Sequence, residues 1–210
     1  MNSIPKRVLV TGAGRCGTSA FMQLMILLHG ESKSICQYID NDSWKNATNY
    51  WNDEIGAGME YIISEKSSDS EIRNSPYIIK DPRLCCELSY ILKKKLIDVE
   101  HIFVFIRDYR KSAQSRKSKD IFMLENRTVR CKDNKKSMIR NQIEYNQRVI
   151  GVLMETISLY DLKHTVINFP TFVDNEEYLY EKLVNTPLSC SREDLSSCFR
   201  ILDTKKVSIK

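Results

Sequence analysis

The chain lacks any apolar run long enough to cross a membrane. Its longest run, Ala20–Leu28, is interrupted by Gln23 and is far shorter than the ~20 residues that a membrane helix needs. We therefore expect no membrane partner. The first residues lead directly into an expected strand at Arg7–Thr11, so no signal or transit peptide is predicted either.

Disulfide and metal-binding patterns are also missing. The seven cysteines are an odd number, Cys85 and Cys86 are adjacent, and no spacing forms a CxxC pair. These features argue against a disulfide framework and against structural zinc, and no acidic cluster suited to magnesium is evident. We expect reduced thiols, a cytoplasmic location and no bound metal.

The composition is that of a globular protein without internal repeats or low-complexity linkers. Of its 210 residues, 42% are hydrophobic and 28% are charged. A chain of this length fits one hydrophobic core, so we expect a single domain over residues 1–210. The sequence carries no signal for an oligomeric state.

Positive charge is concentrated in one segment. The net charge of the chain is +5. Between Arg107 and Arg140 there are twelve basic residues and four acidic ones, a local net charge of +8. Such a segment on a slightly acidic body predicts an anionic ligand, either nucleic acid or a phosphorylated small molecule. Charge alone does not choose between the two.

Hydrophobic patterning predicts strands that alternate with helices. Short apolar runs at 7–11, 76–79, 101–106 and 164–169 are typical of buried strands. Helical spacing is found at 19–28, 44–63, 84–96, 112–119, 137–160 and 176–184, with one short helix from Ser191, and Lys117–Asn134 reads as a charged connection. The pattern predicts an α/β fold in three layers, with a mainly parallel sheet of about four to five strands and helices on both faces.

A glycine-rich segment, GAGRCGTS at residues 12–19, follows the first expected strand and opens a helix. Such a turn directs backbone N–H groups and a helix dipole at an anion. Gly12, Gly14 and Gly17 satisfy the GxGxxG pattern of NAD(P)-dependent reductases, but the acidic residue expected ~20 positions later is missing. The segment also approaches GxxxxGK[ST], with Thr18 in place of the lysine, which disfavours an ordinary ATPase or kinase.

Three ordered motifs resemble the sulfotransferases that use 3′-phosphoadenylyl sulfate (PAPS), in particular bacterial-type members with a P-loop-like fold. Arg15-x-Gly-Thr-Ser is similar to their 5′-phosphosulfate loop. Residues 104–116, VFIRDYRKSAQSR, resemble their 3′-phosphate signature, with Arg107 at a strand end and Ser115 eight residues later. Lys80 in IIKDPRLC occupies the position that the family places at its reaction centre. In the late strand, Phe169-Pro170 replaces the usual Tyr-Glu.

The resemblance implies a set of site residues. The nucleotide would be held by Gly14, Arg15, Cys16, Gly17, Thr18, Ser19, Arg107 and Ser115. Lys80 and Arg15 would stabilise the leaving group. The family uses a Glu or His as general base; here we consider Asp81, or Asp40, which we favour slightly over Asp42. At a helix N-terminus the thiol pKa of Cys16 should fall, but we favour the alternative that Cys16 is simply a small residue where many relatives have serine.

The function that the resemblance implies is sulfuryl transfer from PAPS to a hydroxyl or amine of a small-molecule or glycan acceptor, with 3′-phosphoadenosine 5′-phosphate (PAP) as product. The aromatic segment Tyr38–Tyr61 is expected to help form the acceptor pocket. Two alternatives stay open: a Rossmann-type reductase that uses the glycine loop, and a basic nucleic-acid-binding module. On the leading reading no nucleic-acid partner is expected.

Overall fold

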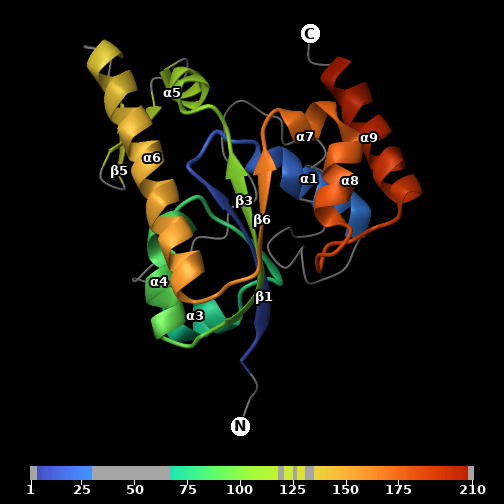
Figure 1. Ribbon diagram of the computed structural model, residues 1–210, viewed down its shortest axis with the longest axis horizontal. Helices are drawn as coiled ribbons and strands as arrows, with labels where there is room; N and C mark the ends of the chain where they lie inside the picture. The colour runs from blue at the N-terminus through green and yellow to red at the C-terminus, as the bar shows by residue number, and fades with distance from the viewer. Residues whose placement is uncertain (1–3, 30–66, 118–120, 125–126, 131–134, 208–210) are drawn as a thin grey trace.

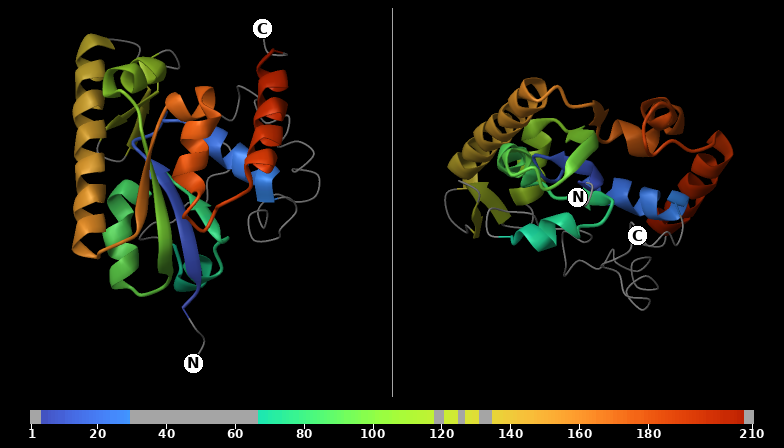
Figure 2. Two further views of the ribbon diagram at one scale, coloured as in Figure 1. Left: turned by 45° about the vertical axis from the view of Figure 1, so that its right-hand side comes forward. Right: turned by 90° about the horizontal axis from the view of Figure 1, so that it is seen from below.

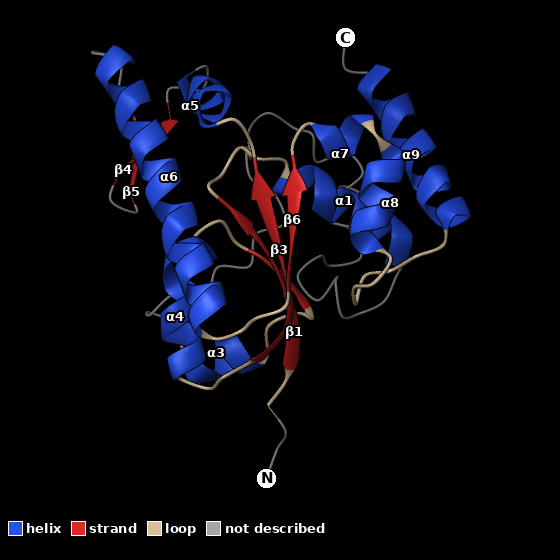
Figure 3. Cartoon of the chain, in the orientation of Figure 1, coloured by secondary structure: helices blue, strands red, loops and turns tan. Residues whose placement is uncertain are grey.

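Four parallel strands form the main sheet (Figure 3). The computed structural model describes residues 4–29, 67–117, 121–124, 127–130 and 135–207. The strands lie in the order β2-β1-β3-β6, and their bounds are β1 (Lys6–Gly12), β2 (Ile78–Lys80), β3 (Asp98–Ile106) and β6 (His164–Asn168). β2 lies on one side of β1, and β3 and β6 lie on the other, so the strand order reverses at β1.

The strands are buried on both faces of the sheet. Successive side chains point to opposite faces, and most of them are apolar, so each strand contributes to a core on either side. In β1, Val8 and Val10 pack into one core while Leu9 packs into the other. In β3, Phe103 faces the first core and Val104 the second. This alternation explains why the strands read as continuous apolar runs in the sequence.

Helices cover both faces of the sheet (Figures 1 and 2). The first core is covered by α1 (Thr18–His29), α7 (Thr171–Asp174), α8 (Glu176–Leu183) and α9 (Arg192–Val207). The second is covered by α3 (Asp69–Arg73), α4 (Leu84–Lys93) and α6 (Lys135–Leu159). A further helix, α5 (Tyr109–Lys117), follows β3 and packs against α6. The expected three-layer α/β architecture is confirmed.

Two expectations about local structure were wrong. The connection at Lys117–Asn134 contains an antiparallel pair, β4 (Ile121–Leu124) and β5 (Arg127–Arg130), which contacts α5 and α6. The apolar run of β4 is only four residues long, IFML, and β5, RTVR, begins and ends with arginine, so neither strand stands out in the sequence. The last helix, α9, has 16 residues rather than being short, because Leu195 and Cys198 anchor it in the first core.

The helix expected at 44–63 and the aromatic segment Tyr38–Tyr61 lie outside the described residues. Within the described part of the chain, no helix combines the length and the apolar character that a membrane span requires.

Candidate functional site

The candidate site lies at the carboxyl edge of the sheet, where β1, β2 and β3 end. In open α/β sheets, ligands bind beyond these strand ends at the point where the strand order reverses. Gly12 at the end of β1 pairs with Phe105 near the end of β3, and Val10 pairs with Lys80, the last residue of β2. The topology therefore brings all three sequence motifs to one edge.

Three residues of the glycine loop have left-handed backbone. The φ angles are +78° at Gly14, +55° at Arg15 and +90° at Gly17. Early in the loop, the Gly14 N–H donates to the Gly12 carbonyl oxygen over 2.7 Å. Arg15 holds a conformation that residues with a side chain rarely adopt, so the loop geometry is imposed by its surroundings.

Glycine is required at two positions of the loop for different reasons. A side chain at Gly17 would overlap the ring of Phe169, which follows β6. At Gly14 the positive φ favours glycine, whereas an added side chain would meet only the movable guanidinium of Arg116. In the dinucleotide fingerprint, the second glycine leaves room for the pyrophosphate, and here a cation lies beside that room.

Arginine side chains connect the glycine loop with α5 and with the residue that follows β3. Arg15 Nε donates to Ser115 Oγ over 3.3 Å, and an NH2 of Arg116 lies 3.5 Å from the Ala13 carbonyl oxygen. Arg107 NH1 donates to the Arg15 carbonyl oxygen over 3.1 Å. The 5′- and 3′-phosphate motifs expected from the sequence are therefore in direct contact.

Arg107 has unused hydrogen-bonding capacity. Its Nε is buried and has no hydrogen-bond partner among the residues that the structure describes. The guanidinium carbon lies 4.9 Å from the centre of the Phe169 ring, which orients it by a cation–π contact. A buried donor without a partner is costly, and an anionic ligand with acceptor oxygens would satisfy it.

Lys80 is buried rather than exposed at its strand end. Its side chain is 1% exposed, and Nζ donates to Ser19 Oγ in the first turn of α1 over 3.1 Å. Burying an ammonium is costly unless polar groups or an anion compensate. Its position between β2 and α1 places it beside the glycine loop, as the resemblance implies.

Asp81 is held by Arg83. The carboxylate is 1% exposed; its Oδ1 accepts from the backbone N–H and Nε of Arg83, and its Oδ2 accepts from an NH2 at 2.9 Å. Both oxygens are engaged, so Asp81 is poorly suited to accept a proton from a substrate. The other candidate base, Asp40, lies outside the described residues.

The lowered thiol pKa expected for Cys16 was wrong, and the favoured alternative of a small residue agrees with the structure. Burial raises the pKa of its thiol to about 11, although backbone N–H groups of the loop and the charge of Lys80 act in the opposite direction. The side chain is 2% exposed and packs against Gly12. Desolvation outweighs the helix N-terminus, and Cys16 is a packing residue beneath the loop.

Sequence reasoning missed three residues that support the site. Phe169 contacts Arg107 and Gly17, whereas the sequence marked it only as a departure from the family pattern. Ser112 Oγ donates to the Gly14 carbonyl oxygen over 3.1 Å, and Asn146 on α6 lies 3.2 Å from Ser112 Oγ. A polar residue on the apolar stripe of α6 was the available signal for Asn146.

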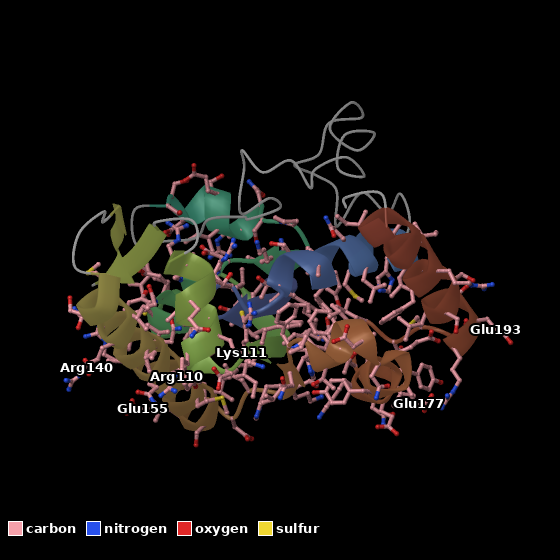
Figure 4. The ribbon with its side chains drawn as sticks, turned by 90° about the horizontal axis from the view of Figure 1, so that it is seen from above. Arg110, Lys111, Arg140, Glu155, Glu177 and Glu193 are labelled. Atoms are coloured by element: carbon pink, nitrogen blue, oxygen red, sulfur yellow. The ribbon has the colours of Figure 1, made fainter. Side chains whose placement is uncertain are left out.

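Charged side chains of both signs surround this edge. Figure 4 looks down on the carboxyl edge and shows Arg110 and Lys111 on α5, with Arg140 and Glu155 of α6 on the same side and Glu177 and Glu193 on the opposite side.

Among the described residues, no group of three or more His, Cys, Asp or Glu side chains could hold a metal ion.

Comparisons of the chain with protein-family models and with curated proteins give no match. The argument for function therefore depends on the residues of the site.

Proposed function

We propose that the chain is a sulfotransferase that transfers a sulfuryl group from PAPS to a hydroxyl or amine of an acceptor, with a P-loop-like glycine loop as its donor site. The observation that carries the proposal is Arg107. Its buried Nε has no hydrogen-bond partner in the described part of the chain, and its NH1 bonds the glycine loop at Arg15. A planar guanidinium suits a phosphate group.

Three cationic side chains from separate motifs support the same proposal. Arg15 belongs to the loop, Lys80 ends β2 and Arg107 follows β3. Arg15 already contacts Ser115, the second residue of the 3′-phosphate motif. A ligand with phosphate groups at two ends, such as PAP, matches this spread of donors better than a ligand with one phosphate.

The chain's own residues would act mainly by positioning and by electrostatic stabilisation. When bound, PAPS supplies an activated sulfuryl group, which moves to the acceptor atom as the bond between sulfur and the 5′-phosphate breaks. Arg15 and Lys80 would stabilise the negative charge that develops on the leaving phosphate oxygen. Arg107 and Ser115 would hold the 3′-phosphate. The acceptor proton would pass to a base, for which Asp40 is our candidate because Arg83 engages Asp81.

The first prediction concerns nucleotide selectivity. PAP should raise the melting temperature by several degrees, and adenosine 5′-phosphate, NAD(P) and oligonucleotides much less, because only PAP carries free phosphate monoesters at both the 3′ and the 5′ position of one adenosine. Arg107→Ala should weaken PAP binding by about tenfold or more, which corresponds to about 1.4 kcal/mol. Arg110→Ala is the matched control, because Arg110 is an exposed arginine on α5, three residues after Arg107. Thermal shift and calorimetry measure both effects.

Lys80→Ala separates binding from turnover in the same experiment. It should leave PAP affinity within about threefold but lower the release of PAP from PAPS by about a hundredfold, the usual cost of one electrostatic donor. Equal stabilisation by PAP and by adenosine 5′-phosphate, or wild-type affinity in Arg107→Ala, would refute the assigned 3′-phosphate site. Stronger stabilisation by NAD(P) would favour the reductase.

A further inference from the structure

Three polar side chains are buried behind the glycine loop, in the interface between α5 and α6. Gln142 and Asn146 are 0% exposed and Ser112 is 2% exposed. Burial of amides and hydroxyls is costly unless their hydrogen bonds are satisfied. Gln142 and Asn146 lie outside the sequence motifs, and Ser112 lies within residues 104–116 but is not one of the two residues assigned to the phosphate there. Their burial therefore needs another explanation.

The three side chains form a continuous path from α6 to the loop backbone. The amides of Gln142 and Asn146 are 2.8 Å apart, Asn146 lies 3.2 Å from Ser112 Oγ, and Ser112 Oγ donates to the Gly14 carbonyl oxygen. The Asn146 amide also lies 3.3 Å from the Ala13 carbonyl oxygen. In either orientation of this amide, a side chain donates to a carbonyl of the loop segment. In one orientation Ser112 donates to the Gly14 carbonyl, and in the other Asn146 donates to the Ala13 carbonyl.

Fixing a carbonyl fixes the N–H of the same peptide unit. In a trans peptide the two groups point in opposite directions, and the peptides of the loop are trans. When Ser112 binds the Gly14 carbonyl, the N–H of Arg15 faces away from α5 and α6. Arg107 NH1 holds the next peptide through the Arg15 carbonyl. An anion-binding nest needs successive N–H groups whose directions are fixed.

We propose that Ser112, Asn146 and Gln142 are positioning residues that set the peptide planes of the glycine loop for anion binding. The inference rests on the proposed function, because it assigns the loop to an anion. It adds that α6, which carries none of the recognised motifs, determines how tightly the loop binds phosphate. We call these three side chains the clamp. The backbone of Arg15 is left-handed and therefore locally unfavourable, and the clamp would hold it in this conformation.

The test compares two buried hydroxyls that each donate to a backbone carbonyl. Ser112→Ala removes the donor to the loop and should weaken binding of PAP and of inorganic pyrophosphate by about tenfold. Thr156→Val removes the hydroxyl that donates to Val152 within α6 over 2.9 Å, and should change both affinities less than twofold. Ser112→Thr, which keeps the hydroxyl, should restore affinity to within about threefold of wild type. Melting temperatures report the stability of each variant.

Gln142→Leu is the second test if Ser112→Ala does not fold, with an expected affinity loss of about threefold. In wild type, the amide proton signal of Arg15 should move on addition of pyrophosphate, and in the variants this shift should shrink. Wild-type affinities and an unchanged Arg15 signal in the variants, with a lower melting temperature alone, would overturn the inference. Binding of pyrophosphate but not PAP by wild type would instead reject the proposed function, and the variants would still test the clamp.

Discussion

At the scale of single residues, Arg15 shows a conflict between local backbone preference and the site. Its φ of +55° costs a residue with a side chain about 1–2 kcal/mol relative to ordinary backbone. Its guanidinium nevertheless contacts Ser115 of the opposite motif. Strain of this kind is retained where the surrounding structure enforces it, and it is common at functional sites.

Two substitutions at Arg15 separate the strain from the charge. Arg15→Gly should be more stable than Arg15→Ala by about 1 kcal/mol, because glycine adopts the left-handed conformation without a steric cost. Both variants should lose PAP affinity to a similar extent, by about tenfold or more, since both lack the cation. Chemical denaturation and calorimetry measure the two effects. Equal stabilities would show that the backbone at Arg15 is unstrained, and unchanged affinity would remove it from the donor site.

At the scale of elements, a polar contact joins β3 to β6 within an otherwise apolar sheet. His101 Nε2 lies 2.8 Å from Thr165 Oγ1, and the imidazole packs against Phe103 at 4.8 Å between ring centres. Burial, followed by the nearby charges of His164 and Lys163, lowers the pKa of His101 below its ordinary value of 6.5. The neutral imidazole is thus the form that the folded state favours.

This shift fixes the sign of a pH effect on stability. As pH falls through about 6.5, the unfolded chain takes up a proton at His101 before the folded chain does, so stability is lost toward acid pH. His101→Asn should therefore lose several degrees less melting temperature between pH 7 and pH 5 than wild type. Burial also lowers the pKa of His29, which leaves a residual dependence of the same sign in the variant. Identical losses in both proteins would exclude a role for His101.

At the scale of the whole molecule, the C-terminal helix completes one of the outer layers. Leu195 is 0% exposed and joins the same core as Phe21 of α1 and Val10 of β1. On the surface, Arg192 of α9 pairs with Glu177 of α8, but exposed ion pairs contribute little. The apolar anchor is therefore what ties α9 to the sheet.

Leu195→Ala tests whether this layer unfolds together with the sheet. The substitution should lower the free energy of unfolding by about 2–5 kcal/mol and move a single cooperative transition, monitored by circular dichroism in the far and the near ultraviolet. Ile201→Ala on the same helix is the control, because Ile201 is 42% exposed and should cost less than about 1 kcal/mol. Two separate transitions would contradict the expectation of a single domain.

Much of the architecture could be predicted because it depends on local patterns. Alternating apolar runs located all four strands of the main sheet, and periodicity located α1, α4, α6 and α8 to within a few residues. The β4–β5 pair and the length of α9 were missed, because their stability depends on packing against distant elements. For the site, the resemblance predicts a common phosphate subsite at Arg107 and Ser115, and Arg15 contacts both of these residues.

The sequence by itself determined the order of the elements, the glycine loop and the cations that follow the strand ends, because these depend on residue type and short-range spacing. Only the tertiary structure decided how these groups are used. Burial reversed the expected pKa shift of Cys16. In the folded chain, Arg83 donates hydrogen bonds to both carboxylate oxygens of the buried Asp81. Folding also brought Phe169 and Asn146 to the loop from later parts of the chain. Desolvation and long-range contacts exist only once the chain has folded, and no local pattern encodes them.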